Sequence, residues 1–416
     1  MKRRQFVKGL LTATASAGML TDNPISLSFR KAMAAEGKSV VVIFQRGGCD
    51  GLNVVVPYSE PNYYNIRPTI AIPAPDSGLA NAALDLNGVF GLDNNMTGLH
   101  QIWQEGNLAI MPTTHYNDAS RSHFDSQHYI ESARPGVRNG QQASDDGWLN
   151  RHMQSQFLPS SFRAVSMGRG GIAQSLVGSA DAKTIGSLAD FSIGVADDEQ
   201  AMLLQRIDQI YQQPASAMTN HQLLQRFGSS LVSDLNIIGD IRNQEYIPDN
   251  GVTYPNSGLA RDLQQVAQLL KAGVGLEIAT VSVGGWDTHA DQAMLLPPNL
   301  GRFSEAITAF YQDMGSMMSD VVILTATEFG RTSHENGSHG TDHGHASCWF
   351  AMGGGISGGI YGDWPGLEDD QLNRGRYLEH TLDCHDIYGD ILVNHMLNND
   401  LATVLPGHSY SPVGLF

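Results

Sequence analysis

Three segments far apart in the chain carry Asp, His and Cys side chains where apolar, strand-like runs end. They are 46–51 (RGGCDG), 284–289 (GGWDTH) and 341–345 (TDHGH). The first two follow such runs directly, and the third comes a short loop after another run, which ends in Glu328. Parallel strands that end at one edge of a sheet bring such residues together. Carboxylates and imidazoles that converge in this way are what a catalytic metal cluster needs.

These segments and the end of that other run offer seven candidate metal ligands. Asp50 lies in a Gly-rich turn, where it would either bind an ion or cap the next helix. In an extended D-x-H stretch both side chains point the same way, so Asp287 and His289 can contact one ion. The alternative is an Asp that only orients a surface His. The predicted ligands are Asp50, Asp287, His289, Glu328, Asp342, His343 and His345.

Three further side chains are candidates for catalysis. Ser122 stands before a helical pattern, where the helix dipole and a nearby cation would favour ionisation of its hydroxyl. Ser120 is close enough to compete for this role, and the commoner role of such a serine is to cap the helix. Arg46 and Arg331 carry guanidinium groups that match the geometry of phosphate or sulfate oxygens. A salt bridge between Glu328 and Arg331 is the alternative for that pair.

The net charge and the N-terminal segment limit which partners the protein can have. The chain has 416 residues and a formal net charge of −17, so its charge would repel nucleic acid. A bound cation would still let it take a small anionic ester as substrate. Residues 1–34 combine paired arginines, an apolar stretch too short to span a membrane and an A-x-A site, which resembles a twin-arginine signal. We therefore expect folded export by the twin-arginine machinery in a bacterium, cleavage near Ala34, a periplasmic or secreted protein, and no stable membrane insertion.

Apolar runs and helical patterns alternate along the rest of the chain. The predicted buried strands are 39–45, 108–111, 276–283 and 321–327, and the predicted helices are 200–213, 221–242, 259–272, 303–318 and 382–397. Continuous apolar strands separated by helices predict an α/β fold, a doubly wound, mostly parallel sheet with helices on both faces. We expect one domain over 35–416, with an insertion around 134–197 that is rich in Gly, Ser and Ala and could cap the site.

Several motifs, in order along the chain, resemble the DUF1501 family of uncharacterised proteins. They are RGGCDGLN (46–53), Tyr63-Tyr64 with Arg67-Pro68, RSHF (121–124), DGWL (146–149), GGWDTH (284–289), TEFGRT (327–332), GTDHGHA (340–346) and YGDWPGL (361–367). That family is placed in the alkaline-phosphatase-like superfamily. The resemblance implies a doubly wound α/β fold and usually two metal ions about 4 Å apart. It also implies a Ser, Thr or formylglycine nucleophile and hydrolysis of phosphate or sulfate esters.

By position, the resemblance makes Asp50 the metal ligand after the first strand and Ser122 the nucleophile. It assigns Asp287 and His289 to the other metal, although the usual D-x-x-x-H spacing is shortened here to D-x-H. Where the superfamily has Asp-His after a strand, this chain has Glu328-Phe329. Either Asp342-His343 is that pair displaced, or His343 and His345 supply the final histidine. No cysteine stands in the sulfatase C-x-P-x-R signature, which argues against formylglycine.

The sequence thus predicts a metal-dependent hydrolase with divalent ions, two as the resemblance implies, for which zinc, manganese and calcium are the candidates. It lacks a G-x-S-x-G elbow and an H-E-x-x-H helix, so a serine α/β-hydrolase and the common zinc protease are disfavoured. A non-catalytic metal-binding or scaffold protein that keeps the fold is the alternative. A redox metalloprotein is disfavoured, because no haem C-x-x-C-H motif or copper-like Cys/His/Met set is present.

Overall fold

The computed structural model describes residues 37–416 except 118, 135–145, 157, 159, 161, 192–196 and 212–231. The predicted signal at 1–34, with its cleavage site near Ala34, therefore lies outside the described residues. Within the described part of the chain, no helix combines the length and the apolar character needed to cross a membrane.

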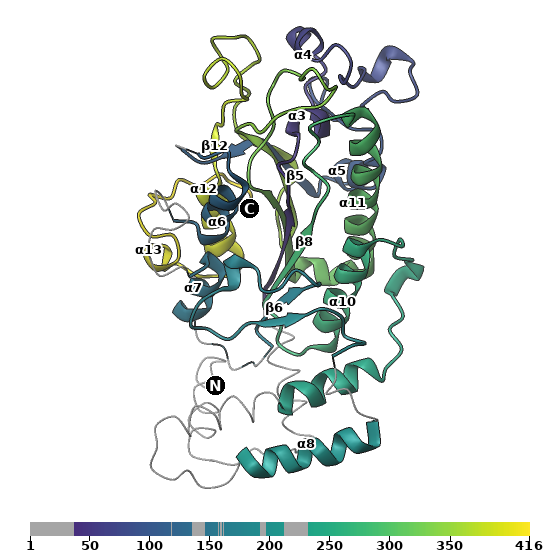
Figure 1. Ribbon diagram of the computed structural model, residues 1–416, viewed down its shortest axis with the longest axis vertical. Coiled ribbons are helices and arrows are strands. Elements are labelled where there is room, and N and C mark those ends of the chain that lie inside the picture. Colours follow the sequence, from purple (N-terminus) through teal and green to yellow (C-terminus); the bar gives the residue numbers. More distant parts are fainter. Residues whose placement is uncertain are drawn as a thin grey trace, which may run out of the picture.

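A nine-stranded sheet forms the centre of the molecule, in the order β11-β5-β10-β9-β1-β8-β6-β7 with β12 beside β5 (Figure 1). Its strands are β1 (Ser39–Gln45), β5 (Leu108–His115), β6 (Ala164–Met167), β7 (Lys183–Ile185), β8 (Ile278–Val283), β9 (Val321–Thr327), β10 (Ser347–Gly353), β11 (Gly359–Ile360) and β12 (Leu382–Asp383). Among the described strands, β10 pairs antiparallel with β5 and β9, and the other pairings in this sheet are parallel. The predicted mostly parallel sheet is confirmed.

Helices cover both faces of this sheet. They are α3 (Gly51–Val54), α4 (Pro61–Ile66), α5 (Thr97–Gln104), α6 (His123–Ser132), α7 (Trp148–Ser155), α8 (Asp197–Tyr211), a helix over 232–242, α10 (Gly258–Ala272), α11 (Gln292–Met314), α12 (Cys384–Asp390) and α13 (Leu401–Val404). Short 3₁₀ segments lie at η1 (Pro75–Ser77), η2 (Gln174–Leu176), η3 (Asp249–Gly251) and η4 (Gly315–Asp320), and a π-helical turn at η5 (Ile391–His395). A small antiparallel sheet joins β2 (Val55–Val56), β4 (Gly91–Leu92) and β3 (Leu84–Asp85).

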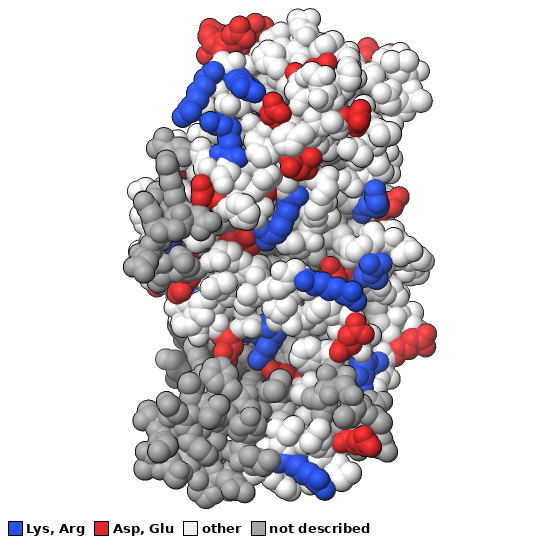
Figure 2. All heavy atoms as spheres, in the orientation of Figure 1, with Lys and Arg blue, Asp and Glu red and all other residues white. Residues whose placement is uncertain are grey.

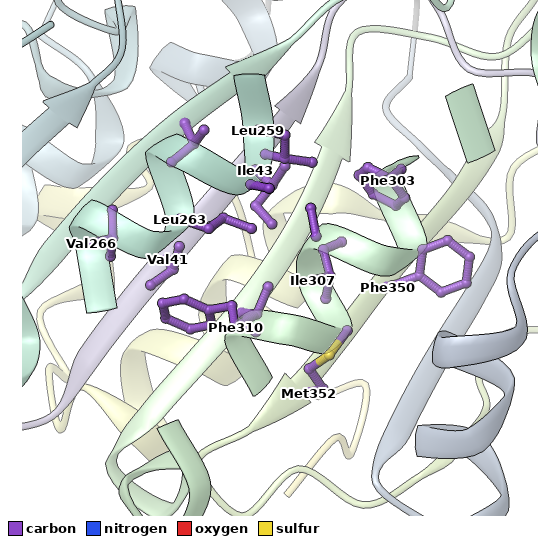
Figure 3. Packing of buried hydrophobic residues seen from close by; sticks show 14 of the residues in the cluster. Val41, Ile43, Leu259, Leu263, Val266, Phe303, Ile307, Phe310, Phe350 and Met352 are labelled. Carbon is purple, nitrogen blue, oxygen red and sulfur yellow. The ribbon is translucent and has the colours of Figure 1, made fainter. Parts of the chain in front are cut away.

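Alternate side chains of β1 explain why helices are needed on both sides. Val41 and Ile43 pack with residues of α10 and α11 on one face (Figure 3). Val40 and Val42 pack on the other face with residues of α6, α7 and α12. A strand buried on both faces must be apolar at consecutive positions, which is why this run is continuous in the sequence rather than alternating.

The four predicted strands are all present. Residues 39–45 and 321–327 coincide with β1 and β9, 108–111 form the first half of the longer β5, and most of 276–283 forms β8. The sequence analysis missed β10, whose sequence SCWFAMG has no β-branched residue and no alternation. Because β10 lies between β5 and β9, the miss concerned a central strand.

The predicted helices are confirmed where the structure describes them, with shifted ends. The patterns at 259–272 and 303–318 correspond to α10 and α11, and α11 begins earlier, at Gln292. The C-terminal helix begins at Cys384, where the Asp383 side chain accepts the backbone N–H of His385. The two central patterns are 200–213 and 221–242, and the parts of them within 212–231 lie outside the described residues. Part of the expected insertion at 134–197 forms β6 and β7, and β6 pairs with β8, so that part extends the central sheet.

A buried carboxylate near the end of α11 ties this helix to the preceding loop and to α10. Asp313 accepts hydrogen bonds from the hydroxyls of Tyr246 and Tyr254 at 2.5 and 2.7 Å and from the Lys271 ammonium at 2.5 Å. Burial alone would raise the pKa of Asp313, but these donors outweigh it and hold the pKa below its usual value. A lowered folded-state pKa stabilises the protein above the unfolded pKa, and this stabilisation is lost as the pH falls through the folded-state value.

We expect Asp313→Ala to lower the free energy of unfolding by about 3 kcal/mol at pH 7, because it leaves buried donors without their acceptor. The control is Asp320→Ala, which removes a carboxylate 2.7 Å from Lys38 at an exposed position. Exposed pairs contribute below about 1 kcal/mol. Urea unfolding of both variants compares the two effects, and equal losses would contradict the structural role of Asp313.

Candidate metal centre

The segments after β1, β8 and β9 meet at one edge of the sheet, because β1 lies between the other two strands. Asp287 comes from the segment after β8, and Glu328 directly follows β9. Gly47, after β1, has a positive φ of 128°, and a Cβ there would lie 2.7 Å from the backbone nitrogen of Asp287. The absence of a side chain at Gly47 therefore lets the two segments touch.

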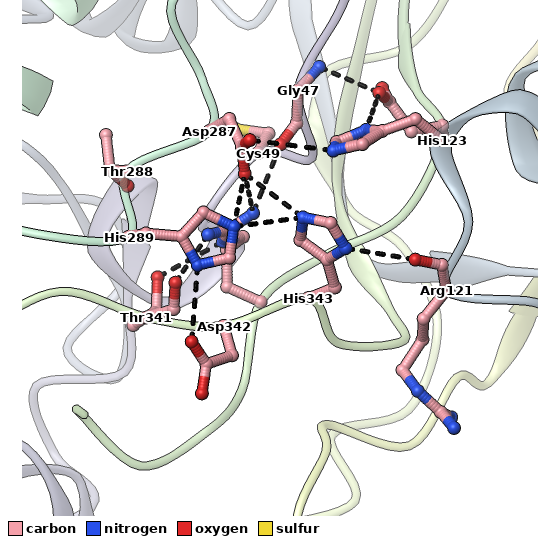
Figure 4. A network of polar contacts seen from close by, with 12 residues as sticks. Gly47, Cys49, Arg121, His123, Asp287, Thr288, His289, Thr341, Asp342 and His343 are labelled. Carbon is pink, nitrogen blue, oxygen red and sulfur yellow. Dashed lines mark hydrogen bonds and ion pairs between the residues drawn. The ribbon is translucent and has the colours of Figure 1, made fainter.

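Three imidazoles converge on the carboxylate of Asp287 (Figure 4). Its Oδ1 atom lies 3.0 Å from Nε2 of His289 and 3.2 Å from Nε2 of His343. These two Nε2 atoms are 3.1 Å apart. On the other side, Asp287 Oδ2 lies 3.6 Å from Nε2 of His123. Asp287 and His343 thus belong to two overlapping groups of donors, one completed by His289 and the other by His123.

Each of the three histidines has an acceptor at its other ring nitrogen. The acceptors are Glu328 Oε1 for His123 (2.9 Å), Asp342 Oδ1 for His289 (3.2 Å) and the Arg121 carbonyl for His343 (3.0 Å). An imidazole that donates from Nδ1 carries its lone pair on Nε2. The outer contacts therefore favour the tautomer in which all three lone pairs point toward Asp287.

Such an arrangement fits a cation. The lone pairs of His289 and His343 face each other and a carboxylate oxygen, and without a positive charge between them they would repel. The three separations of 3.0, 3.1 and 3.2 Å match ligands about 3.3 Å apart around a tetrahedral zinc, for which metal–nitrogen bonds are about 2.0–2.1 Å. The side chains of Asp287 and His289 are 42% and 46% exposed, so solvent or substrate can reach this position.

Glu328 orients a histidine in this structure. Its side chain is fully buried, and Oε1 accepts hydrogen bonds from His123 Nδ1, from Gln127 at 2.9 Å and from the Gly47 backbone at 2.8 Å. Burial alone would raise the pKa of Glu328, but the hydrogen bonds, first that from His123, lower it. The same hydrogen bond raises the pKa of His123. The structure thus places Glu328 behind a candidate ligand, not among the ligands as the sequence predicted.

The two arginines predicted to grip substrate are engaged within the protein. Arg331 is 2% exposed and donates to Asp287 Oδ1 at 2.6 Å and to the Gly47 carbonyl at 3.2 Å. Burial alone would raise the pKa of Asp287, but Arg331 outweighs it and keeps the pKa low, so this carboxylate stays ionised. Arg46 donates to Glu131 at 3.1 Å and to Gln127 at 3.0 Å. Arg331 therefore positions Asp287, and Arg46 ties the segment after β1 to α6.

Asp50, the predicted ligand after β1, is held in a buried ion pair. Both of its carboxylate oxygens accept from Arg67, at 2.6 and 2.9 Å, and Gln292 donates to it as well. Asp50 and Arg67 are 1% and 0% exposed. The described His, Cys, Asp and Glu groups whose ligand atoms gather closely do not include Asp50. The structure thus separates it from the Asp287 group, because a cation from the protein already occupies its oxygens.

The histidines of the 341–345 segment separate in a similar way. His343 reaches Asp287, whereas His345 is buried and its Nε2 lies 2.9 Å from Nδ1 of His380. Burial, then the charge of His380, lowers the pKa of His345 to about 4. The sequence analysis missed both His123 and His380. The adjacency of His123 to the predicted nucleophile was a signal that could have identified it.

The two candidate nucleophiles differ in their contacts. The Ser120 hydroxyl accepts the backbone N–H of Ser122 at 3.0 Å and lies 3.3 Å from Asp125 Oδ2. Ser122 is the N-cap residue of α6, but its side chain makes no capping hydrogen bond. Ser122 also lies between Arg121 and His123, both of which contact the centre.

Residues 37–409 match the family model described as "Protein of unknown function (DUF1501)". No curated protein matches the sequence. Similar solved structures include a sulfatase from Pseudoalteromonas sp., 10% identical over 91% of this chain and 73% of that chain, with a TM-score of 0.39. Others are an alkaline phosphatase from the Antarctic bacterium TAB5 (9% identity, 88% and 100% coverage, TM-score 0.36) and a protein in the alkaline phosphatase superfamily from Vibrio parahaemolyticus (8%, 92% and 79%, 0.37). The activity must therefore be argued from the side chains of this chain.

Asp287→Ala and Asp50→Ala should have opposite phenotypes. We expect Asp287→Ala to weaken zinc binding at this centre at least about a hundredfold, because it removes the shared donor. Asp50→Ala should leave zinc binding near the wild-type value but lower the free energy of unfolding by about 3–5 kcal/mol, since Arg67 loses its counter-charge. Competition titration with a zinc chelator and urea unfolding measure the two quantities. Loss of zinc binding in folded Asp50→Ala protein would restore Asp50 as a ligand.

Glu328→Gln tests the outer contacts of the centre. A neutral amide can no longer hold His123 Nδ1 as a carboxylate does, so we expect zinc affinity to fall about 10- to 100-fold. The matched control is Glu335→Gln, a change of the same chemistry at a carboxylate that accepts from Thr69 instead of a histidine of the centre. Isothermal titration with zinc gives both affinities, and equal affinities in the two variants would exclude the proposed role of Glu328.

Proposed function

The chain belongs to the DUF1501 family, and we propose that it is a metal-dependent hydrolase of small phosphate or sulfate esters. The observation that carries the proposal is the convergence of three imidazole Nε2 atoms on an ionised, partly exposed carboxylate. A closed structural site would bury its ligands, whereas this group stays open on one side. An open position is what a cation needs to bind an ester oxygen or water.

The residues divide the work as follows. Asp287, His289, His343 and His123 would hold the metal, and a divalent cation bound there supplies Lewis-acid polarisation and neutralises the charge of the ester. The hydroxyl of Ser122 attacks phosphorus or sulfur, which forms an ester to Ser122 and releases the alcohol, and water then hydrolyses that ester. Ser122 is favoured over Ser120, because the Ser120 hydroxyl is already bonded to its neighbours.

We infer that two ions bind at full occupancy, as the resemblance implies. The support is that Asp287 presents Oδ1 to His289 and His343 and Oδ2 to His123, so that its carboxylate could bridge two ions. Imidazole-rich donors suit zinc or manganese better than calcium, which prefers oxygen ligands throughout.

The substrate anion then needs a cation other than Arg46 and Arg331. Arg121 and Arg376 are exposed beside the centre. The guanidinium of Arg121 lies over the ring of Tyr377, 5.0 Å from its centroid, and Arg376 lies 3.4 Å from Asp342. We propose these two arginines as the anion contacts, since both are exposed and belong to residues that contact Asp342 or His343. On the face shown in Figure 2, basic side chains lie among acidic ones, with no broad basic patch of the kind that nucleic acids need.

The location is part of the proposal. The twin-arginine-like signal predicted at 1–34 would export the folded protein to the periplasm or beyond. Folded export suits a centre assembled from segments as distant as His123 and His343, because the ligands would be in place before the protein leaves the cytoplasm.

A second candidate function is a metal-binding or scaffold protein without catalysis. The specific observation in its favour is Phe329, which occupies the position where the superfamily resemblance expects a histidine. Its ring lies 4.8 Å from that of His343 and 5.0 Å from that of His123, between centroids. An apolar ring there removes a donor from the centre and leaves the remaining ligands to bind a cation by themselves.

Turnover distinguishes the two functions. We expect zinc- or manganese-loaded mature protein to hydrolyse at least one member of a panel of phosphate and sulfate monoesters. Ser122→Ala should reduce kcat at least about a hundredfold, since the nucleophile is lost. Ser120→Ala is the matched control and should keep most of the activity. No turnover across the panel, with metal bound, would favour the scaffold function, and full activity of Ser122→Ala would reject the assigned nucleophile.

A further inference from the structure

A second group of imidazoles lies where the end of β5 meets the start of β10. His345 Nε2 is 2.9 Å from His380 Nδ1, and Glu379 Oε1 lies 2.9 Å from His380 Nδ1 and 3.6 Å from His345 Nε2. His345 comes just before β10, and Glu379 and His380 come just before β12. Three donor atoms from two separate segments thus form a compact triangle.

His115, the last residue of β5, packs against this group. It is 1% exposed, and its ring meets that of His345 edge-on with 4.5 Å between the centroids. The Nε2 atom of His115 is buried without a hydrogen-bond partner. Buried polar atoms are nearly always satisfied, so a polar partner or a cation beside His115 is the expected arrangement.

We propose that His345, Glu379 and His380 hold a zinc ion at a site separate from the Asp287 centre, with the ring of His115 packed against it. The separations are 2.9, 2.9 and 3.6 Å, on either side of the roughly 3.3 Å expected between donors of a tetrahedral zinc. Two imidazoles and one carboxylate suit zinc better than magnesium or calcium. The side chains of His345 and His380 are 10% and 15% exposed and that of Glu379 is 36% exposed, so the two histidines are less exposed than Asp287 and His289.

The site would join parts of the fold that the sheet alone joins weakly. β12 is only two residues long and pairs with the end of β5, where Asp383 lies opposite His115. Zinc would connect the short β12–β5 pairing to the start of β10. It would also fix the segment that carries His343 two residues before His345, and so hold that ligand of the Asp287 centre in place. This inference does not depend on the proposed hydrolase activity.

The test measures the zinc content of protein in which the Asp287 centre has been removed. Mature protein with Asp287→Ala is compared with the same protein carrying His380→Ala in addition, by equilibrium dialysis followed by elemental analysis. We expect about one zinc per chain in the first and close to none in the second. Zinc should raise the Tm of the first protein and not of the second. Cobalt should give a visible absorption band of tetrahedral intensity in the first only.

Two further variants cover failed folding and non-specific effects. Glu379→Gln, in the otherwise native chain, keeps the shape of the side chain and should lower the zinc content by one equivalent. His334→Ala removes an exposed histidine from a neighbouring loop and should change nothing. Equal zinc contents with and without His380 and Glu379 would overturn the proposal and leave a hydrogen-bonded network only. Because the readout is metal content, loss of ester hydrolysis and loss of this site are distinguished.

Discussion

The ion pair between Arg331 and Asp287 is the interaction on which the candidate centre depends. Arg331 is buried and is fixed by the carbonyls of Gly47 and Thr341, so it holds one oxygen of Asp287 in place and keeps the carboxylate ionised. The Nε2 atoms of His289, His343 and His123 lie 3.0, 3.2 and 3.6 Å from this carboxylate, so one bound cation would join them to it. The pair also joins the segments that follow β1, β8 and β9, and so makes the edge of the sheet the place where ligands meet.

Other buried charged groups also fix the segments that carry the candidate ligands. Asp50 and Arg67 connect the turn after β1 with the backbone of Thr332 and Ser333. Glu328 accepts a hydrogen bond from Nδ1 of His123, the ring nitrogen that does not face Asp287. These groups are costly to bury unless paired, and here each has partners for its charge. The result is a rigid surround for an open group of ligands, which is the arrangement that a catalytic metal site needs.

The sequence predicted the sheet well and the individual roles less well, for physical reasons. Continuous apolar runs such as 39–45 can be read directly, because a strand buried on both faces has no other pattern. The role of Asp50 could not be read, since nothing in the local sequence shows that the Arg67 side chain reaches it. Likewise, the H-x-H spacing of His343 and His345 predicts two ligands on one extended segment, but the backbone around Gly344 sends the two side chains to different groups. Local spacing indicates which residues can bind a metal, and only the tertiary contacts decide which of them do.

The central claim is that one cation pocket is formed by Asp287 with His289 and His343, and extended by His123. Anomalous diffraction from crystals of the zinc-loaded protein, recorded on both sides of the zinc absorption edge, tests it most directly. The account predicts a peak within bonding distance of Asp287 Oδ1 and of the Nε2 atoms of His289 and His343, about 2.0–2.2 Å for each. An anomalous peak at Asp50, or none near Asp287 at saturating zinc, would contradict it.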